Sequence, residues 1–145
     1  MPQLSHSEKN YMEAIYVLTR RLGSVRSIDV ANFMNCSKPS VTTAVANLCE
    51  KGYLQKMDHD LVFTDQGRSV AENIFERHCI LAHALVEIGV DELTAVKDAQ
   101  TMERVISDEV IAVTADAIQC QKRLTGICPV PFDGMGKLFC NGVRI

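Results

Sequence analysis

Residues 37-SKPSVTTAVANLCEKGYL-54, continued by 55-QKMDHDLVFT-64, set the order of elements in this chain. The first half of the stretch is small and hydroxylic, although serine and threonine are poor helix formers. The second half has the apolar spacing of an amphipathic helix and runs through Lys51 to a stop at Gly52. Ser37 is placed to cap this helix. A start this rich in hydroxyl groups favours a helix whose first turns face something other than the protein's own core.

The elements on either side extend the pattern. Two strand-like runs, Tyr53 to Met57 and Leu61 to Thr64, flank the polar turn 58-DHD-60 and predict a hairpin. Upstream, apolar periodicity predicts a helix over residues 7–22 and a short second helix capped by Ser27. Helix, helix, turn, helix and hairpin is the order of a winged helix-turn-helix.

Three further helices are expected downstream. Thr64 is expected to cap a long helix that runs to about Ile88, and Asp91 a fifth helix that ends near Ile106. Ser107 is expected to cap a sixth helix over residues 108–124, and the tail from Thr125 is expected to be irregular. The fold class predicted is therefore mainly α.

The composition of the chain limits the classes of function that it can have. The 145 residues are 47% apolar and 23% charged, as in globular proteins, and no apolar run reaches the length of a membrane span. The N-terminus lacks the features of a signal peptide, so a cytoplasmic chain is expected. Residues 1–66 are neutral and residues 67–145 acidic, which places any contact with a polyanion in the first half. We find no phosphate loop, nucleophile elbow or HExxH motif, and we expect no enzyme.

DNA is the expected partner of the third helix. In a winged helix-turn-helix this helix lies in the major groove, with its N-terminal residues at bases and phosphates. Two alternatives remain: the hydroxyl groups only cap the helix, or the module has kept its fold without binding DNA. The residues expected to contact DNA are Arg26, Ser27, Ser37, Lys38, Pro39, Ser40, Thr42, Thr43 and Lys56.

Several blocks together resemble the metal-dependent repressors that include the diphtheria toxin repressor and the manganese transport regulator. These blocks are EKNYMEAIYVL, SKPSVTTAVANLCEKGYL with LVFTDQGRSVA, RHCILAHALVEIGVDE, TMERVISDEV and ICPVPFDG. The resemblance implies a homodimer on a palindromic operator, with Mn(II) or Fe(II) as corepressor. It also implies a DNA-binding domain over residues 1–70, a helical dimerisation and effector domain over 71–133, and a tail over 134–145.

The resemblance also implies where the metal ligands lie. Carried over residue by residue, the ligand positions fall on Asn10, Glu13, His78, Gln100 and Glu103. Oxygen ligands with one imidazole suit Mn(II) or Fe(II). Several positions depart from the family pattern. Gln100 stands where a carboxylate or thiol is expected, Arg104 where a histidine is expected, and Ala82 where many members have an acidic residue, and position 96 is Val96.

This departure leaves two interpretations open. A reduced site of Glu13, His78 and Glu103, helped by amide oxygens, still holds a metal, or the guanidinium of Arg104 takes the place of the ion and no metal is needed. Cys79 and His83, spaced i, i+4, are the alternative ligands for a relocated site. Cys120, Cys128 and Cys140 match no ligand spacing, and their role stays open.

Overall fold

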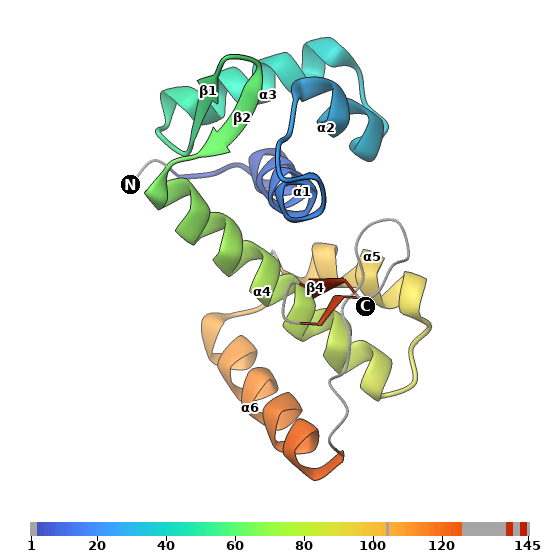
Figure 1. Cartoon of the computed structure of the whole chain (residues 1–145). Helices are drawn as coiled ribbons and strands as arrows, with labels where there is room; N and C mark the ends of the chain where they lie inside the picture. Colours follow the sequence, from blue (N-terminus) through green and yellow to red (C-terminus); the bar gives the residue numbers. More distant parts are fainter. Residues whose placement is uncertain (1–2, 104, 126–138, 141–142, 145) are drawn as a thin grey trace. The chain divides into compact units, whose positions relative to one another are not determined.

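The structure is a computed structural model that describes residues 3–103, 105–125, 139–140 and 143–144 (Figure 1). The chain forms two compact units, residues 1–75 and 76–145, and helix α4 (Asp65–Glu87) belongs to both. Among the described residues, no helix has both the length and the hydropathy needed to cross a membrane.

The first unit has the predicted winged helix-turn-helix order. Helices α1 (His6–Leu22), α2 (Ser27–Met34) and α3 (Lys38–Glu50) precede the antiparallel strands β1 (Leu54–Met57) and β2 (Asp60–Phe63). Leu54 pairs with Phe63 and Met57 with Asp60, which leaves a tight turn in which Asp58 has a φ of +57°. Aspartate tolerates this left-handed conformation better than most residues do. The core consists of fully buried side chains from all three helices and the loop before α2: Met12, Ile15, Val25, Val30, Val41, Val45 and Leu48.

Most predicted helix starts are confirmed. The Ser37 hydroxyl accepts the N–H of Ser40, the Thr64 hydroxyl accepts the N–H of Gly67, and the Asp91 carboxylate accepts the N–H of Thr94. The expected cap at Ser27 is wrong, because Ser27 is the first residue of α2 and Arg26 holds the cap position. There the carboxylate of Asp29 accepts the backbone N–H of Arg26 at 2.8 Å, so no hydroxyl cap is needed.

The first unit also contains a part-buried ion pair that joins two helix ends. Lys51 Nζ donates to the Glu8 carboxylate at 2.7 Å and to the carbonyl of Gln3 at 3.0 Å. The same carboxylate oxygen accepts the N–H of Ser5, which completes a capping box at the start of α1. Hydrogen bonding to Lys51 holds the pKa of the Glu8 carboxyl below its usual value of 4.5, although burial opposes this.

We expect the exchange Lys51→Met to destabilise the first unit by about 2 kcal/mol at pH 7, because it leaves a buried carboxylate without its cation. A carboxyl with a lowered folded-state pKa stabilises fully above its unfolded-state value of 4.5, and this contribution is lost as pH falls through the folded-state pKa. The difference from wild type should therefore shrink as pH falls from 5 toward 3. Urea unfolding across this pH range, with EDTA present, measures it. In a Glu8→Gln background the exchange should cost little at any pH, and an undiminished cost there would contradict the assignment.

The second unit has a small described core. The C-terminal part of α4, α5 (Glu92–Met102) and α6 (Asp108–Thr125) surround a cluster of Leu81, Ala82, Ala99 and Ile111, with Ile80, Met102 and Ile106 packed against it. Five large apolar side chains of this unit are exposed: Ile88, Leu93, Val105, Val110 and Val113. A small core beside so much exposed apolar surface is typical of a unit that packs against a further partner.

Several element boundaries, and the tail, differ from the sequence predictions. Helix α3 ends at Glu50, and Lys51 is its C-cap. Helix α5 ends at Met102 and not near Ile106, and in the turn that follows the amides of Val105 and Ile106 both donate to the carbonyl of Met102. In the tail, which we expected to be irregular, β3 (Phe139–Cys140) and β4 (Val143–Arg144) pair antiparallel.

Candidate functional site

The hydroxyl groups at the start of α3 have two roles. Ser37 Oγ caps the helix and lies 2.8 Å from Ser40 Oγ, and Thr42 Oγ1 donates to the carbonyl of Lys38 at 3.0 Å. Capping, which we gave as an alternative to DNA binding, therefore explains part of the hydroxyl-rich sequence. It does not explain Thr43, which is exposed one turn after Pro39. Some of the hydroxyl groups at this helix start thus bond to the end of the helix, and others face outward.

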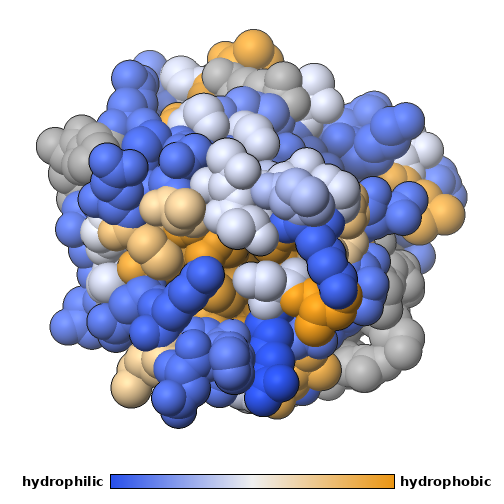
Figure 2. All heavy atoms as spheres, turned by 90° about the horizontal axis from the view of Figure 1, so that it is seen from above, coloured by the Kyte–Doolittle hydropathy of each residue, from blue (hydrophilic) through white to orange (hydrophobic). Residues whose placement is uncertain are grey.

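Nearly all the residues expected to contact DNA are exposed. The exception is Ser27, which is half-buried at the start of α2. Figure 2 views the molecule from above α2, α3 and the hairpin, and hydrophilic side chains surround a middle region of weakly polar and hydrophobic ones. The exposed members of the expected set are Arg26, Ser37, Lys38, Pro39, Ser40, Thr42, Thr43 and Lys56.

A groove of about 550 Å³ runs along this exposed side of α3. Four of its lining residues come from the first turns of α1 and five from α3. Asn47, one turn after Thr43, is among them and was missed by the sequence reasoning, although the i, i+4 spacing from Thr43 was a usable signal. The full lining is Ser5, Ser7, Glu8, Tyr11, Pro39, Ser40, Thr43, Ala44 and Asn47.

Three contacts hold the elements around α3 in place. Arg26 Nε lies 3.6 Å from Asp60 Oδ1, and the N–H of Leu61 donates to the carbonyl of Val25 at 2.7 Å, so the hairpin is tied to the start of α2. Tyr11 donates from its hydroxyl to Cys36 Sγ at 3.7 Å, directly before the cap residue of α3. Burial raises the pKa of the Tyr11 phenol, which therefore stays a donor at neutral pH.

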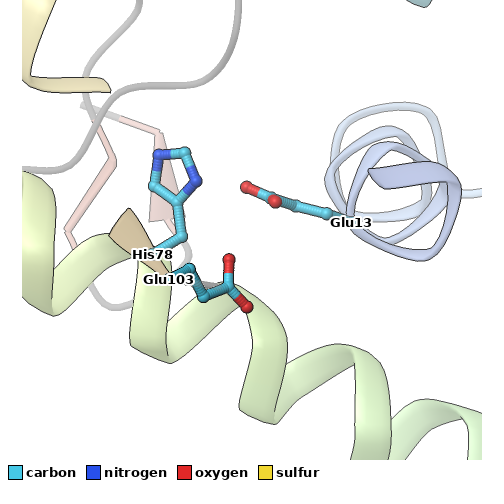
Figure 3. Close-up of side chains that lie close together, drawn as sticks. All are labelled: Glu13, His78 and Glu103. Carbon is cyan, nitrogen blue, oxygen red and sulfur yellow. The ribbon is translucent and has the colours of Figure 1, made fainter. Parts of the chain in front are cut away.

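A pair of side chains of the types that bind metals lies within the second unit. His78 is buried on α4, and Glu103 is half-buried in the turn that follows α5. A ring nitrogen of His78 and a carboxylate oxygen of Glu103 lie within 4.8 Å of each other, and Figure 3 shows both side chains. Two ligands of one ion with bonds of about 2.1 Å lie at most about 4.2 Å apart, so small side-chain rotations bring this pair into range. The donor set fits a divalent cation.

The other expected ligands have varied environments. Glu13, also drawn in Figure 3, is buried on α1 in the first unit. Asn10, one turn earlier on α1, is half-buried with its Nδ2 3.3 Å from His6 Nε2. Gln100 is exposed on α5. Arg104 lies outside the described residues.

The packing of α4 accounts for one departure from the family pattern. Ala82, where many family members have an acidic ligand, is 1% exposed and belongs to the apolar cluster of the second unit. A carboxylate at this position would be desolvated among Leu81, Ala99 and Ile111, at a cost that a neutral methyl group avoids. In this chain a core residue, Ala82, stands where many family members have an acidic ligand.

The alternative ligands lie farther along α4. His83 is buried and Cys79 is half-buried, one turn apart. Among the described residues, neither of them belongs to a group of three or more His, Cys, Asp or Glu side chains suited to a metal. The side chains of Cys120, Cys128 and Cys140 lie outside the described part of the chain.

Comparison with known proteins agrees with both units. Residues 3–59 match the model for the iron dependent repressor, N-terminal DNA binding domain, and residues 64–119 match the iron dependent repressor, metal binding and dimerisation domain. The chain belongs to the iron-dependent repressor family. Its second matched segment contains His78 and Glu103, and its first contains Glu13 and all of α3.

Relatives of known sequence or structure belong to the same group of regulators. The transcriptional regulator MntR of Escherichia coli O6:H1 and that of O157:H7 are each 32% identical over 103 residues, which are 70% of this chain and 66% of the relative. Two solved structures share the iron-dependent repressor fold. The metal-dependent transcriptional regulator MtsR has a TM-score of 0.72 and 19% identity, over 77% of this chain and 53% of its own. The IdeR of T. acidophilum has a TM-score of 0.69 and 20% identity, over 97% and 65%.

Proposed function

We propose that this chain is a metal-responsive transcriptional regulator, a repressor that binds a palindromic DNA operator as a homodimer in the cytoplasm. The observation that carries the proposal is the exposed, hydroxyl-rich start of α3 beside a two-stranded wing. Membership of the iron-dependent repressor family supports it, and the relatives' descriptions as regulators favour regulation over catalysis. In this proposal residues 1–70 bind DNA and residues 71–133 dimerise and bind the effector.

The DNA contacts follow from the geometry of α3. Its N-terminal turns would enter the major groove, where exposed Thr43 and Ser40 meet base edges and the helix N-terminus attracts phosphate. Lys38 and Lys56 would contact the backbone as solvated cations. Arg26 would have to exchange its carboxylate partner Asp60 for a phosphate. We therefore expect Arg26 to contribute less than the two lysines to the affinity for DNA.

Two copies of the chain would pair through the second unit. The exposed side chains of Val105, Val110 and Val113 lie in or beside α6, and a dimer interface would remove this apolar surface from water. The match of this segment to a dimerisation domain supports the choice of a second copy as the partner. Two α3 helices spaced by a dimer would read a palindromic site.

The effector we propose is Mn(II) or Fe(II). Glu13, His78 and Glu103 are the strong ligands, and Asn10 and Gln100 are expected to add only neutral amide oxygens. A bound divalent cation supplies the positive charge that a pair of carboxylates needs. The protein's own part is to hold two carboxylates and one imidazole deprotonated and in place. Coupling between metal and DNA must then be reciprocal, so each strengthens the binding of the other.

A second candidate rests on Arg104. If its guanidinium replaces the ion by pairing with the carboxylates of Glu13 and Glu103, the chain binds its operator without metal or answers a different signal. Cys79 and His83 would then be the first residues to test as an alternative sensor. DNA binding that EDTA does not weaken is the result that favours this candidate.

The double exchange Ser40→Ala with Thr43→Ala tests the DNA interface. We expect it to weaken operator binding about 10- to 100-fold, because base contacts each contribute about 1–3 kcal/mol of discrimination. Operators selected from random duplexes, followed by fluorescence anisotropy at several salt concentrations with and without Mn(II), measure the affinity. The salt dependence of nonspecific binding should stay nearly unchanged, because it reports phosphate contacts.

Two controls interpret this result. The exchange Ser69→Ala removes an exposed hydroxyl from α4 and should leave operator binding unchanged. Sedimentation should find the double variant as dimeric as wild type. A variant that keeps its operator affinity and loses the dimer instead would place α3 in the subunit interface. A wild-type protein that binds no duplex at any salt concentration would show a winged module without DNA binding.

A further inference from the structure

The position of Glu103 depends on the turn in which it lies. Helix α5 ends at Met102, and Glu103 is its C-cap, with a backbone N–H that still donates to the carbonyl of Ala99. The amides of Val105 and Ile106 both donate to the carbonyl of Met102 at 3.0 Å, and the side chains of Met102 and Ile106 pack against the apolar cluster. These contacts fix the two ends of the turn. The same packing brings the turn against α4, which carries Leu81, Ala82 and His78, and a polar connection adds to it.

Arg77 supplies that connection. Its Nη2 donates to the carbonyl of Ile106 at 3.1 Å, and its Nη1 forms a hydrogen bond and ion pair with the Asp108 carboxylate at the start of α6. The Arg77 side chain is 18% exposed, whereas the Asp108 side chain is 97% exposed. The bond to the Ile106 carbonyl is therefore better shielded from water than the ion pair, and we expect it to contribute more.

We propose that Arg77 is a positioning residue for the metal ligands His78 and Glu103. Arg77 directly precedes His78 on α4, and the carbonyl that it holds is three residues after Glu103. One helical segment thus carries the imidazole and also the guanidinium that holds the turn of the carboxylate against it. A planar guanidinium donates to two acceptors at once, which a lysine ammonium on a flexible stem does less well.

This proposal rests on the proposed metal-binding function and adds a residue that touches no metal. Partners that orient metal ligands contribute about 10- to 100-fold to metal affinity in other proteins. Without Arg77 the turn of residues 103–107 would keep its own backbone bonds but move more freely relative to α4. Metal binding would then have to order the turn, and the apparent affinity would fall by the cost of that ordering.

The test compares Arg77→Met, Arg77→Lys and Asp108→Asn in the full-length protein. Calorimetric titration of the chelator-stripped protein with Mn(II) should find the affinity of Arg77→Met weakened about 10-fold or more, with Arg77→Lys between it and wild type. Asp108→Asn keeps an acceptor and the Ile106 bond, and should weaken affinity less than about 3-fold. Hydrogen exchange of the metal-free protein should be faster in a peptide spanning residues 103–108 of Arg77→Met, and saturating Mn(II) should restore its protection.

The outcomes separate this proposal from the one on which it rests. If Arg77→Met binds Mn(II) as tightly as wild type and its hydrogen exchange in residues 103–108 is unchanged, the positioning role is overturned. The proposed metal site is not affected by that result. No Mn(II) binding by wild type, with His78→Ala indistinguishable from it, overturns the metal site and the positioning role together. If Arg77→Met proves misfolded by circular dichroism, Arg77→Lys decides: wild-type affinity and exchange in that variant overturn the need for a two-pronged donor.

Discussion

Exchanging Gly67 for alanine is expected to destabilise the first unit by about 3 kcal/mol or more, the upper end of what overpacking costs. This change in stability has the opposite sign to the one that a glycine-to-alanine substitution in a helix usually causes. Glycine inside a helix normally costs about 0.5–1 kcal/mol relative to alanine, so helix propensity alone predicts a gain for Gly67→Ala in α4. The structure predicts a loss instead.

The reason is the approach of the hairpin backbone to α4. A Cβ atom on Gly67 would lie 1.8 Å from the carbonyl oxygen of Tyr53 and 2.7 Å from its carbonyl carbon. That carbonyl cannot move away freely, because it accepts the N–H of Thr64 at 3.1 Å and the Thr64 hydroxyl also bonds to Gly52. Either the start of α4 or the base of the wing must shift, and both lie in the unit that we propose to bind DNA.

Urea unfolding followed by circular dichroism measures this effect, with EDTA in all samples so that metal does not contribute. Ser69→Ala, at an exposed position two residues along the same helix, should change the free energy of unfolding by less than about 0.5 kcal/mol. Operator affinity of Gly67→Ala should fall as well, because the wing and α3 are held through the same backbone. A Gly67→Ala protein as stable as wild type would show that the close approach to Tyr53 is absent.

Local signals in the sequence were sufficient for most of the fold. Hydroxyl and carboxylate caps at Ser37, Thr64 and Asp91 gave the helix starts, because capping depends only on the next three residues. The cap of α2 was mispredicted because a serine before an apolar run is a common capping signal. That signal does not indicate that the carboxylate of Asp29 will accept the backbone N–H of Arg26. The pair of strands in the tail had a local signal too, Asn141-Gly142, which favours a two-residue hairpin turn and was overlooked.

Features that depend on contacts between distant segments could not be predicted from local sequence. Nothing near Gly67 in the chain indicates that the backbone of Tyr53 will lie against it. The end of α5 at Met102 depends on how Met102 and Ile106 pack on a cluster supplied by α4 and α6. Spacing on α1 and resemblance to a family suggested Glu13, His78 and Glu103 as metal ligands. Only the structure shows that His78 and Glu103, which are 25 residues apart in the chain, lie close to each other.

Loss of metal binding on removal of a strong ligand is the second large effect that we expect. The chelator-stripped, reduced protein should bind Mn(II) and, under anaerobic conditions, Fe(II) with micromolar affinity in calorimetry. His78→Ala and Glu103→Ala, and by our proposal Glu13→Ala, should each weaken binding more than about 100-fold, because orienting partners alone contribute about 10- to 100-fold. Asn10→Ala and Gln100→Ala remove neutral amide ligands and should cost less than about 10-fold.

Cys79 and His83 provide the matched controls on α4. His83→Ala removes a second buried imidazole of the same helix, and Cys79→Ser a thiol beside His78. Both variants should keep wild-type affinity for Mn(II). If they lose it while His78→Ala and Glu103→Ala retain it, the metal site lies one turn farther along α4 than we propose. Zn(II) should be titrated in parallel, because a thiolate and imidazole pair favours it over Mn(II).

Arg104→His decides between the two interpretations of the family departure. The exchange puts an imidazole at the position where the family resemblance places a histidine, and it removes a fixed positive charge that would repel a cation. If the site is merely reduced, affinity for Mn(II) should rise about 10-fold or more, and operator binding should become more dependent on metal through the reciprocal coupling. If wild type binds none of the three metals and Arg104→Ala abolishes operator binding, the guanidinium has taken over the role of the ion, and the metal assignment fails.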